Sequence, residues 1–148
     1  FMAAISMGYP TRSAEVDMLE HHGASNPLAQ LRPVTDAAGV LAARRRVGEV
    51  YVHPALKDYV VGLVSATRTS DLLRLGGSPR ASLHLLRAAK ARAALAGRGF
   101  VIPEDAAELA APVLAHRVLL SHRAQTTQTT ASDVVADLVA DVPAPRRT

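Results

Sequence analysis

The segment Gly76–Ser82 (Gly-Gly-Ser-Pro-Arg-Ala-Ser) combines residue types that can bind an anion. Two glycines permit a tight turn, Ser78 can cap a helix, and the proline suits a first helical position. Arg80 then projects from the first turn, where backbone N–H groups and the positive helix end favour an anion such as phosphate. Its planar guanidinium can take two phosphate oxygens. His84 and Arg87 follow on the same face. The segment is therefore either a phosphate-binding helix start or an ordinary capped helix.

The histidines do not show the spacing of a metal site. His21 and His22 are neighbours on a predicted helix, so their side chains point about 100° apart. His116 and His122 lie six positions apart, across a predicted helix end. No histidine pair has the i, i+4 spacing that forms a zinc site together with a carboxylate. We predict that this chain alone holds no metal.

Other catalytic patterns are also missing from the sequence. Glu104, Asp105 and Glu108 could form an acid/base group, but their place at a helix start explains them as capping and dipole residues. The chain has no cysteine, no Gly-x-Ser-x-Gly elbow and no Gly-x-x-x-x-Gly-Lys-Ser/Thr phosphate loop. We expect the chain alone to be catalytically inactive.

The composition and charge of the chain argue against some classes of binding partner. The 148 residues include 17 Lys and Arg against 13 Asp and Glu, a net charge of +4. The run Arg44-Arg45-Arg46 fans over about 200° of a helix rather than forming a stripe, and stacking aromatics are few, which disfavours nucleic acid. No stretch approaches the ~20 apolar residues that cross a bilayer. We expect a cytoplasmic protein without a membrane partner, and the absence of cysteine fits that compartment.

The periodicity predicts an all-α fold, a bundle of about six helices preceded by one N-terminal strand. Residues 1–10 are apolar and end at Gly8 and Pro10, so they predict a strand whose partners lie in sequence outside this chain. We therefore expect the chain to be part of a longer protein. Helices are predicted over about 12–22, from a Thr35 cap to Val50, and over about 54–67, 80–96, 103–112 and 132–142, with a polar connector over 121–131.

Several details of these helices are specific enough to test. Thr11 should cap the first helix, which should bury Val16 and Leu19 and stop at Gly23. Pro112 should break or kink the fifth helix. The predicted inner faces, in chain order, are Val40, Ala43, Val47 and Val50; Leu56, Tyr59, Val60, Leu63, Val64 and Thr67; Ser82, Leu86, Ala89, Ala93 and Ala96; and Val135, Leu138, Val139 and Val142.

Motifs along nearly the whole chain resemble the C-terminal part of MoxR-type AAA+ ATPases. They are Phe1 to Pro10, Asn26-Pro27-Leu28, Val52-His53, Leu56 to Arg68, Leu75 to Ser82, Val101 to Asp105, and Pro112 to Arg117. Gly77 stands where the family usually has alanine. The magnesium-chelatase ATPase subunit has a related lid and is the nearest alternative family.

The resemblance implies a division of the chain and a role for a few residues. Residues 1–10 would be the last strand and hinge of the nucleotide-binding subdomain, 11–142 the helical lid, and 143–148 a tail. Arg80 would be the sensor-2 arginine that reaches the ATP γ-phosphate, and its neighbours Pro79 and Ala81 would also contact the nucleotide. Tyr9 and Pro10 would lie at the hinge, where adenine commonly packs. The phosphate loop and the Mg²⁺-binding motif would belong to sequence before Phe1.

The resemblance also implies an activity for the complete protein. It would be an ATPase that couples ATP hydrolysis to chaperone-like remodelling, as a ring and most simply a hexamer, alongside a von Willebrand factor A-type partner. Two interpretations from other classes stay open. One is a basic helical nucleic-acid-binding module, and the other is a protein-interaction bundle in which the glycine turn is only a cap.

Overall fold

The computed structural model describes residues 1–21 and 27–146, which form two compact units. One unit consists of Phe1–Ala4 and Arg44–Thr148, and the other of Ile5–Ala43. The division falls within helix α2 (Ala37–Glu49). The predicted division into residues 1–10, 11–142 and 143–148 concerns the subdomains of a longer protein and stays a prediction.

The unit Ile5–Ala43 holds α1 (Arg12–His21), the 3-10 helix η1 (Pro27–Gln30) and the start of α2. Thr11 caps α1 as predicted, because its Oγ1 accepts a hydrogen bond from the Ala14 N–H at 3.3 Å. The predicted helix end at His22 and Gly23 lies outside the described residues. The prediction that Val16 and Leu19 are buried is wrong: both side chains are exposed. A helix buries a face only where another element covers it, and α1 has no buried residue.

Helix α2 begins one residue later than expected. Asp36, not Thr35, caps it, since Asp36 Oδ1 accepts from the Gly39 N–H at 2.8 Å. Its predicted inner face is buried only toward its C-terminal end: Val40 is exposed, whereas Val50, directly after the helix, is buried.

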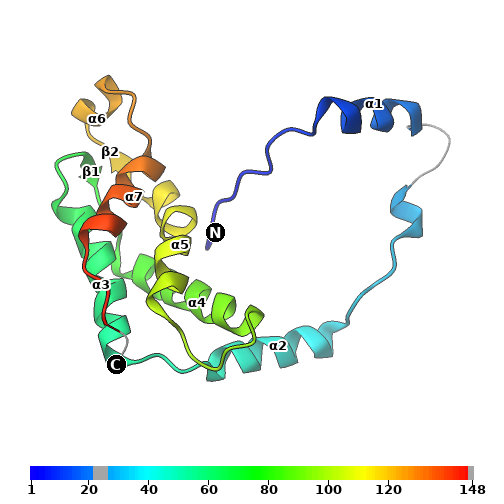
Figure 1. The fold of residues 1–148 in the computed structure, drawn as a ribbon, viewed down its shortest axis with the longest axis horizontal. Helices are drawn as coiled ribbons and strands as arrows, with labels where there is room; N and C mark the ends of the chain where they lie inside the picture. The colour runs from blue at the N-terminus through cyan, green and yellow to red at the C-terminus, as the bar shows by residue number, and fades with distance from the viewer. Residues whose placement is uncertain (22–26, 147–148) are drawn as a thin grey trace. The chain divides into compact units, whose positions relative to one another are not determined.

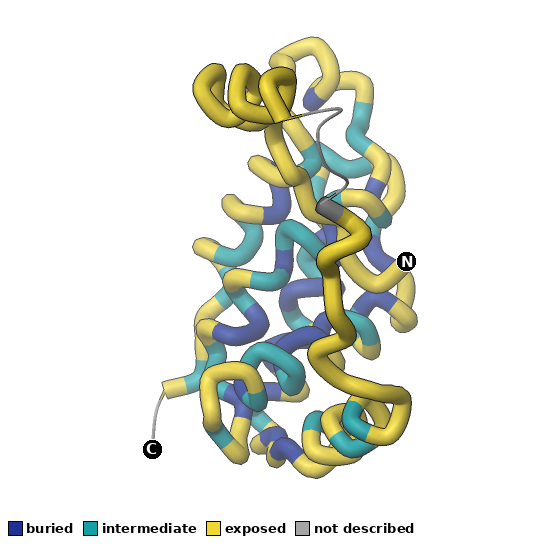
Figure 2. Tube along the Cα trace, turned by 90° about the vertical axis from the view of Figure 1, so that its right-hand side faces the viewer, coloured by how far each residue is buried: buried dark blue, intermediate teal, exposed yellow. Residues whose placement is uncertain are grey.

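The other unit is a helical bundle, as predicted. Helices α3 (Pro54–Thr69), α4 (Pro79–Leu95), α5 (Pro103–Leu114) and α7 (Ala131–Asp141) pack on one another, with α5 in contact with the other three (Figure 1). The dark blue positions in Figure 2 mark the buried residues, most of which lie on these helices. Its core combines larger aliphatic side chains, such as Leu63, Leu85 and Leu114, with fully buried alanines.

Helix α3 matches its prediction in every buried position. Its buried residues are Leu56, Tyr59, Val60, Leu63, Val64 and Thr67. The helix starts where Pro54 predicts, and the side chain of His53 caps it by accepting from the Ala55 N–H at 3.2 Å. The 3.6-residue spacing of its large apolar side chains fixes one inner face, and the exposed face carries Lys57, Asp58 and Arg68 together with Val61.

Helix α4 buries a face offset from the predicted one. Ala81, Leu85 and Ala88 are fully or nearly buried, together with Ala89 and Ala93 from the predicted set. Ser82 and Leu86 are only half-buried, and Ala96 is exposed beyond the helix end. Alanines occur around most of this helix, so its composition does not fix the inner face. Close packing against α5 and α3 selects the small residues instead.

Helix α5 does not break at Pro112 but continues to Leu114, followed by the 3-10 helix η2 (Ala115–Arg117). Pro112 removes a single N–H close to the helix end, and the Ala115 N–H still bonds to the Ala111 carbonyl. The proline therefore lies where an α-helix tightens into a 3-10 turn, as helix ends often do.

Three features of the structure differ from the predicted elements. A short antiparallel pair joins β1 (Leu73–Leu75) to β2 (Leu119–Leu120). The connector over 121–131 contains helix α6 (His122–Thr126), capped by Ser121, whose Oγ accepts from Ala124 N–H at 3.4 Å. Residues 1–10 are not assigned to a strand, because a strand needs a hydrogen-bonded neighbour and no described strand pairs with this segment. Of the described helices, none has the length and apolarity to cross a membrane.

Candidate functional site

The turn before α4 is fastened to the C-terminal end of α3. The buried hydroxyl of Thr67 donates to the Val64 carbonyl at 2.5 Å and accepts from the Gly77 N–H at 2.8 Å. Arg68 Nε donates to the Gly77 carbonyl at 2.7 Å. Both backbone groups of Gly77 are therefore paired with α3, and this pairing fixes where α4 begins.

The two glycines of the turn have different reasons to be there. A Cβ at Gly76 would lie 2.5 Å from the Thr67 carbonyl oxygen and 2.7 Å from Arg68 Cα, which are backbone atoms that cannot move away. A Cβ at Gly77 would meet side-chain atoms instead, the nearest being Val64 Cγ1 at 3.1 Å. Gly76 thus permits the close approach of the turn to α3, whereas Gly77 tolerates a small side chain more readily.

Ser78 does not use its side chain as a cap. It occupies the N-cap position with extended backbone, but its hydroxyl makes no capping hydrogen bond, and its carbonyl accepts from the Ala81 N–H at 2.8 Å. The prediction of a serine cap is right about position and wrong about the hydroxyl. Pro79 is the first residue of the helix and has no N–H to satisfy.

Arg80 is the second residue of α4, and its side chain is exposed. Among residues 1–21 and 27–146, no hydrogen bond or ion pair engages its guanidinium. The backbone start of the helix contributes a positive partial charge at the same end. An uncommitted guanidinium at a rigidly held helix start can receive an anion without breaking an internal contact.

His84 lies one turn after Arg80 and is held by a residue far along the chain. Its Nδ1 is 2.8 Å from Nη2 of Arg117, the last residue of η2. Burial first, and then the positive charges of Arg117, Arg80 and Arg87, lower the pKa of His84 below its usual range. The sequence does not single out Arg117 as a functional candidate, because nothing local in it reveals a partner 33 positions away.

The carboxylates at the start of α5 form a structural ion-pair group. Asp105 is 1% exposed, and its oxygens accept from Arg98 Nη1 and Nη2 at 2.8 and 2.6 Å and from the Ile102 N–H at 2.9 Å. Glu108 pairs with Arg92. The Asp105 carboxylate caps the helix as predicted, and its oxygens are fully occupied, so it is not available as an acid or base.

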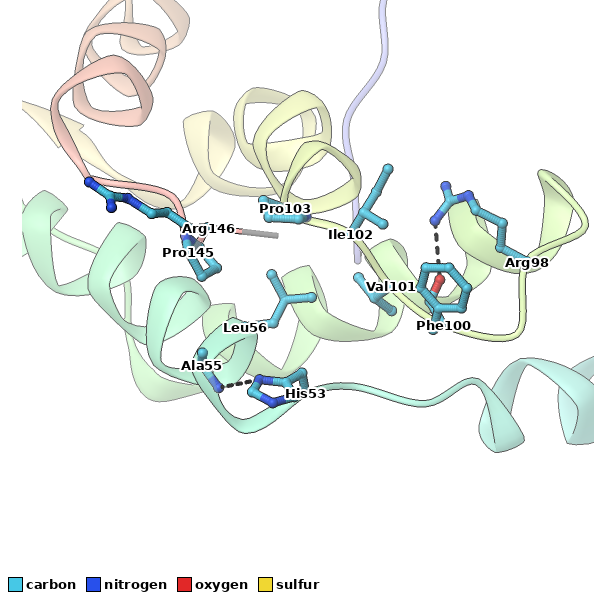
Figure 3. A pocket seen from close by; sticks show the side chains of 10 residues that line it. All are labelled: His53, Ala55, Leu56, Arg98, Phe100, Val101, Ile102, Pro103, Pro145 and Arg146. Carbon is cyan, nitrogen blue, oxygen red and sulfur yellow. Dashed lines mark hydrogen bonds between the residues drawn. The ribbon is translucent and has the colours of Figure 1, made fainter. Parts of the chain in front are cut away.

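A pocket of about 750 Å³ lies elsewhere in the bundle, between the start of α3, the segment before α5 and the C-terminal tail (Figure 3). Its walls are largely apolar. They consist of His53, Ala55, Leu56, Arg98, Phe100, Val101, Ile102, Pro103, Pro145 and Arg146. None of the residues from Gly76 to Ser82 lines it. No local sequence pattern reveals this pocket, since it is assembled from three separate segments.

Metal-binding geometry is absent from the part of the chain that the structure describes. No three His, Asp or Glu side chains in that part come together as a metal site would require. His22 lies outside the described residues.

The AAA lid domain family matches residues 65–138, which is half of the chain. The chain belongs to the AAA lid domain family. The match covers the start of α4 and its arginine, the whole of α5 and most of α7.

Alignments with related proteins cover nearly all residues of this chain. The uncharacterized protein YeaC of Bacillus subtilis is 34% identical over 145 residues, and Chaperone MoxR1 of Mycobacterium tuberculosis is 32% identical over 155. The alignments cover 98% and 99% of this chain but only 45% and 41% of those relatives. The resemblance to MoxR-type AAA+ ATPases predicted from the sequence is confirmed, and the chain spans less than half the length of these relatives.

A solved structure shares the fold. The crystal structure of a candidate ATPase from Cytophaga hutchinsonii superposes with a TM-score of 0.88 at 26% identity, over 99% of this chain and 47% of that one. The alignment thus extends well beyond the residues that the family matches, to both structural units of the lid chain.

The other predicted nucleotide contacts of the lid lie on either side of Arg80 and before α1. Pro79 and Ala81 flank Arg80; Pro79 is exposed, whereas Ala81 is fully buried and its N–H donates to the Ser78 carbonyl. Tyr9 and Pro10 lie directly before α1 in the unit Ile5–Ala43, and both are exposed. These four assignments stay predictions.

Proposed function

We propose that this chain is the lid of a MoxR-type AAA+ ATPase and that Arg80 is its sensor-2 arginine. The observation that carries the proposal is the state of Arg80: exposed, without an internal partner in the described chain, and placed by the Thr67–Gly77 bond at the start of a lid helix. Arg80, the first turn of α4 and, from the other unit, Tyr9 and Pro10 would contact ATP. Mg²⁺ would be held by the remainder of the longer protein.

The chemistry suited to Arg80 is stabilisation of charge on the phosphoryl group during transfer. Phosphoryl transfer depends on positioning and on cations that meet the developing charge, and an arginine supplies both. After hydrolysis the γ-phosphate is gone, so Arg80 loses its partner. The lid can then rotate as a rigid body about the segment near residues 8–12.

At the level of the assembly, we propose that this rotation moves a neighbouring subunit. The complete protein would form a ring, most simply a hexamer, and would use ATP for chaperone-like remodelling with a von Willebrand factor A-type partner. The chaperone-like activity in this proposal is supported by the name of one relative, Chaperone MoxR1 of Mycobacterium tuberculosis. We also propose that the protein works in the cytoplasm.

The test is ATP turnover by the longer protein that contains this chain. Arg80→Ala should lower turnover about tenfold to a thousandfold, because removing one charge-stabilising donor raises the barrier by about 1.4–4 kcal/mol. Arg45→Ala is the matched control, since Arg45 is an exposed arginine far from the start of α4 in sequence. Unchanged turnover in Arg80→Ala, or a longer protein without a phosphate loop, would refute the proposal.

A further inference from the structure

Arg117 joins three parts of the bundle. Its Nε donates to the Val113 carbonyl at 2.9 Å, which ties it to the end of α5. Its Nη2 donates to the carbonyl of Phe1 and faces His84 Nδ1 at 2.8 Å. One guanidinium therefore holds the N-terminal residue, α4 and the end of α5 together.

The chemistry of this contact fixes the protonation of His84. A guanidinium has only donors, so Nδ1 of His84 must accept with its lone pair, and the proton of the neutral ring must sit on Nε2. A proton added at Nδ1 would abolish the bond and leave two cations 2.8 Å apart. In the described part of the chain, the charged side chains that act on His84 are all cations, namely Arg117 from η2 and Arg80 and Arg87 from α4.

A second bond fastens the same N-terminal segment. The Ala4 N–H donates to the Pro112 carbonyl at 2.8 Å, near the end of α5. Phe1–Ala4 consequently belongs to the bundle rather than to the segment that follows it, as the division into compact units also indicates.

We infer that Arg117 and His84 are positioning residues, which fasten Phe1–Ala4 and the Arg80-bearing face of α4 to the same end of α5. The functional part of this inference rests on the proposed function. There, residues 1–10 end the nucleotide-binding subdomain and the lid turns about residues 8–12. That motion must break the bonds from Ala4 to Pro112 and from Arg117 to Phe1. The two bonds thus form a latch, which sets where Arg80 stands before the lid moves.

Amide hydrogen exchange at Ala4 tests the latch in the longer protein that contains this chain. Arg117→Ala should speed Ala4 exchange about tenfold or more, because a hydrogen bond from a charged donor slows opening by at least that factor. Arg87→Ala is the control: it removes a cation near His84 that makes no hydrogen bond within the described part of the chain. It should leave Ala4 exchange unchanged.

Nitrogen NMR of the His84 ring gives an independent readout. The wild-type ring should be the Nε2–H tautomer, Arg87→Ala should keep that tautomer, and Arg117→Ala should lose the preference. Arg117→Lys keeps the positive charge but loses the planar guanidinium that donates to several acceptors at once, so it should also speed Ala4 exchange. This variant replaces Arg117→Ala in the test if the alanine variant is poorly folded. Unchanged Ala4 exchange in both Arg117 variants, or an Nδ1–H tautomer in the wild type, would overturn the inference.

The link to ATP is tested separately in the longer protein. If Arg117 acts by positioning Arg80, then Arg117→Ala should lower kcat several-fold with little change in KM. In an Arg80→Ala background it should have no further effect. Additive losses would show that Arg117 does not act through Arg80. If Arg80→Ala itself leaves turnover unchanged, the proposed function fails while the exchange and tautomer results still decide the latch.

Discussion

At the scale of single residues, Asp105 shows how the lid uses a buried charge. Its carboxylate closes the loop between α4 and α5, because Arg98 lies just past the end of α4 and binds it through two parallel hydrogen bonds. Burial alone would raise the pKa of Asp105. The Arg98 and Ile102 hydrogen bonds, and the charges of Arg98 and Arg92, outweigh that effect and hold the pKa below its usual range.

Asp105→Asn should therefore destabilise the bundle and change its response to acid. Removing one partner of a buried pair costs about 2–4 kcal/mol, since the Arg98 charge is left uncompensated. Because the folded pKa lies below the unfolded value near 3.8, the wild-type carboxylate adds stability above that pH and loses it as the pH falls through the folded pKa. Urea unfolding at pH 7 and pH 3 measures both effects.

Glu108→Gln provides the control for this experiment. Glu108 also pairs with Arg92, but its side chain is 55% exposed, so its loss should change the free energy of unfolding by less than about 1 kcal/mol. If Asp105→Asn lost as much stability between pH 7 and pH 3 as the wild type does, the carboxylate of Asp105 would not be the source of that acid sensitivity.

At the scale of elements, the turn that starts α4 depends on the space beside α3. Gly76→Ala should destabilise the chain by about 1–3 kcal/mol, because the new Cβ would overlap the Thr67 and Arg68 backbone. Gly77→Ala is the matched control and should change stability by less than about 1 kcal/mol, since the new methyl group meets side chains and also restricts the unfolded chain. Thermal unfolding compares the two, and equal losses would contradict the assigned geometry.

The elements that could be predicted are those with strong local signals. Helix α3 has large apolar residues at helical spacing and a proline at its start, so both its bounds and its inner face follow from the sequence. Helix α4 is predictable as a helix, but alanines around it leave the inner face to packing. Strands β1 and β2 are only three and two residues long and come from segments far apart in the chain, so no local sequence pattern predicts their pairing.

The candidate site divides in the same way. Arg80 could be identified because glycine, proline and arginine occur together in a few residues. The contacts that hold the site in place could not be identified from the sequence, because each joins residues that are not neighbours in the chain. Thr67 bonds to Gly77 across a turn, and His84 contacts Arg117 in η2. The sequence thus identifies the candidate ligand-binding residue, Arg80, better than it identifies the residues that hold it in position.

At the scale of the whole molecule, the two units differ in how much they bury. The bundle holds all the buried apolar residues of the described chain. In Ile5–Ala43 the large apolar residues of known placement are exposed, namely Ile5, Met7, Tyr9, Val16, Met18, Leu19, Leu28, Leu31, Val34, Val40 and Leu41. Since apolar burial is the main stabilising term in folding, the two units should differ strongly in local stability.

Hydrogen exchange along the 148-residue chain tests this difference, and two helices of similar length make the comparison fair. Helix α1 has ten residues and none buried, whereas α7 has eleven and buries Val134 and Val135 against the bundle. An isolated helix this short is marginal in water, because nucleation is costly and no packing repays it. The α1 amides should therefore exchange at least about a hundredfold faster than the central amides of α7. Equal protection of the α1 and α7 amides from exchange would contradict this prediction. It would mean that another surface packs on α1 in solution and stabilises it from outside its own unit.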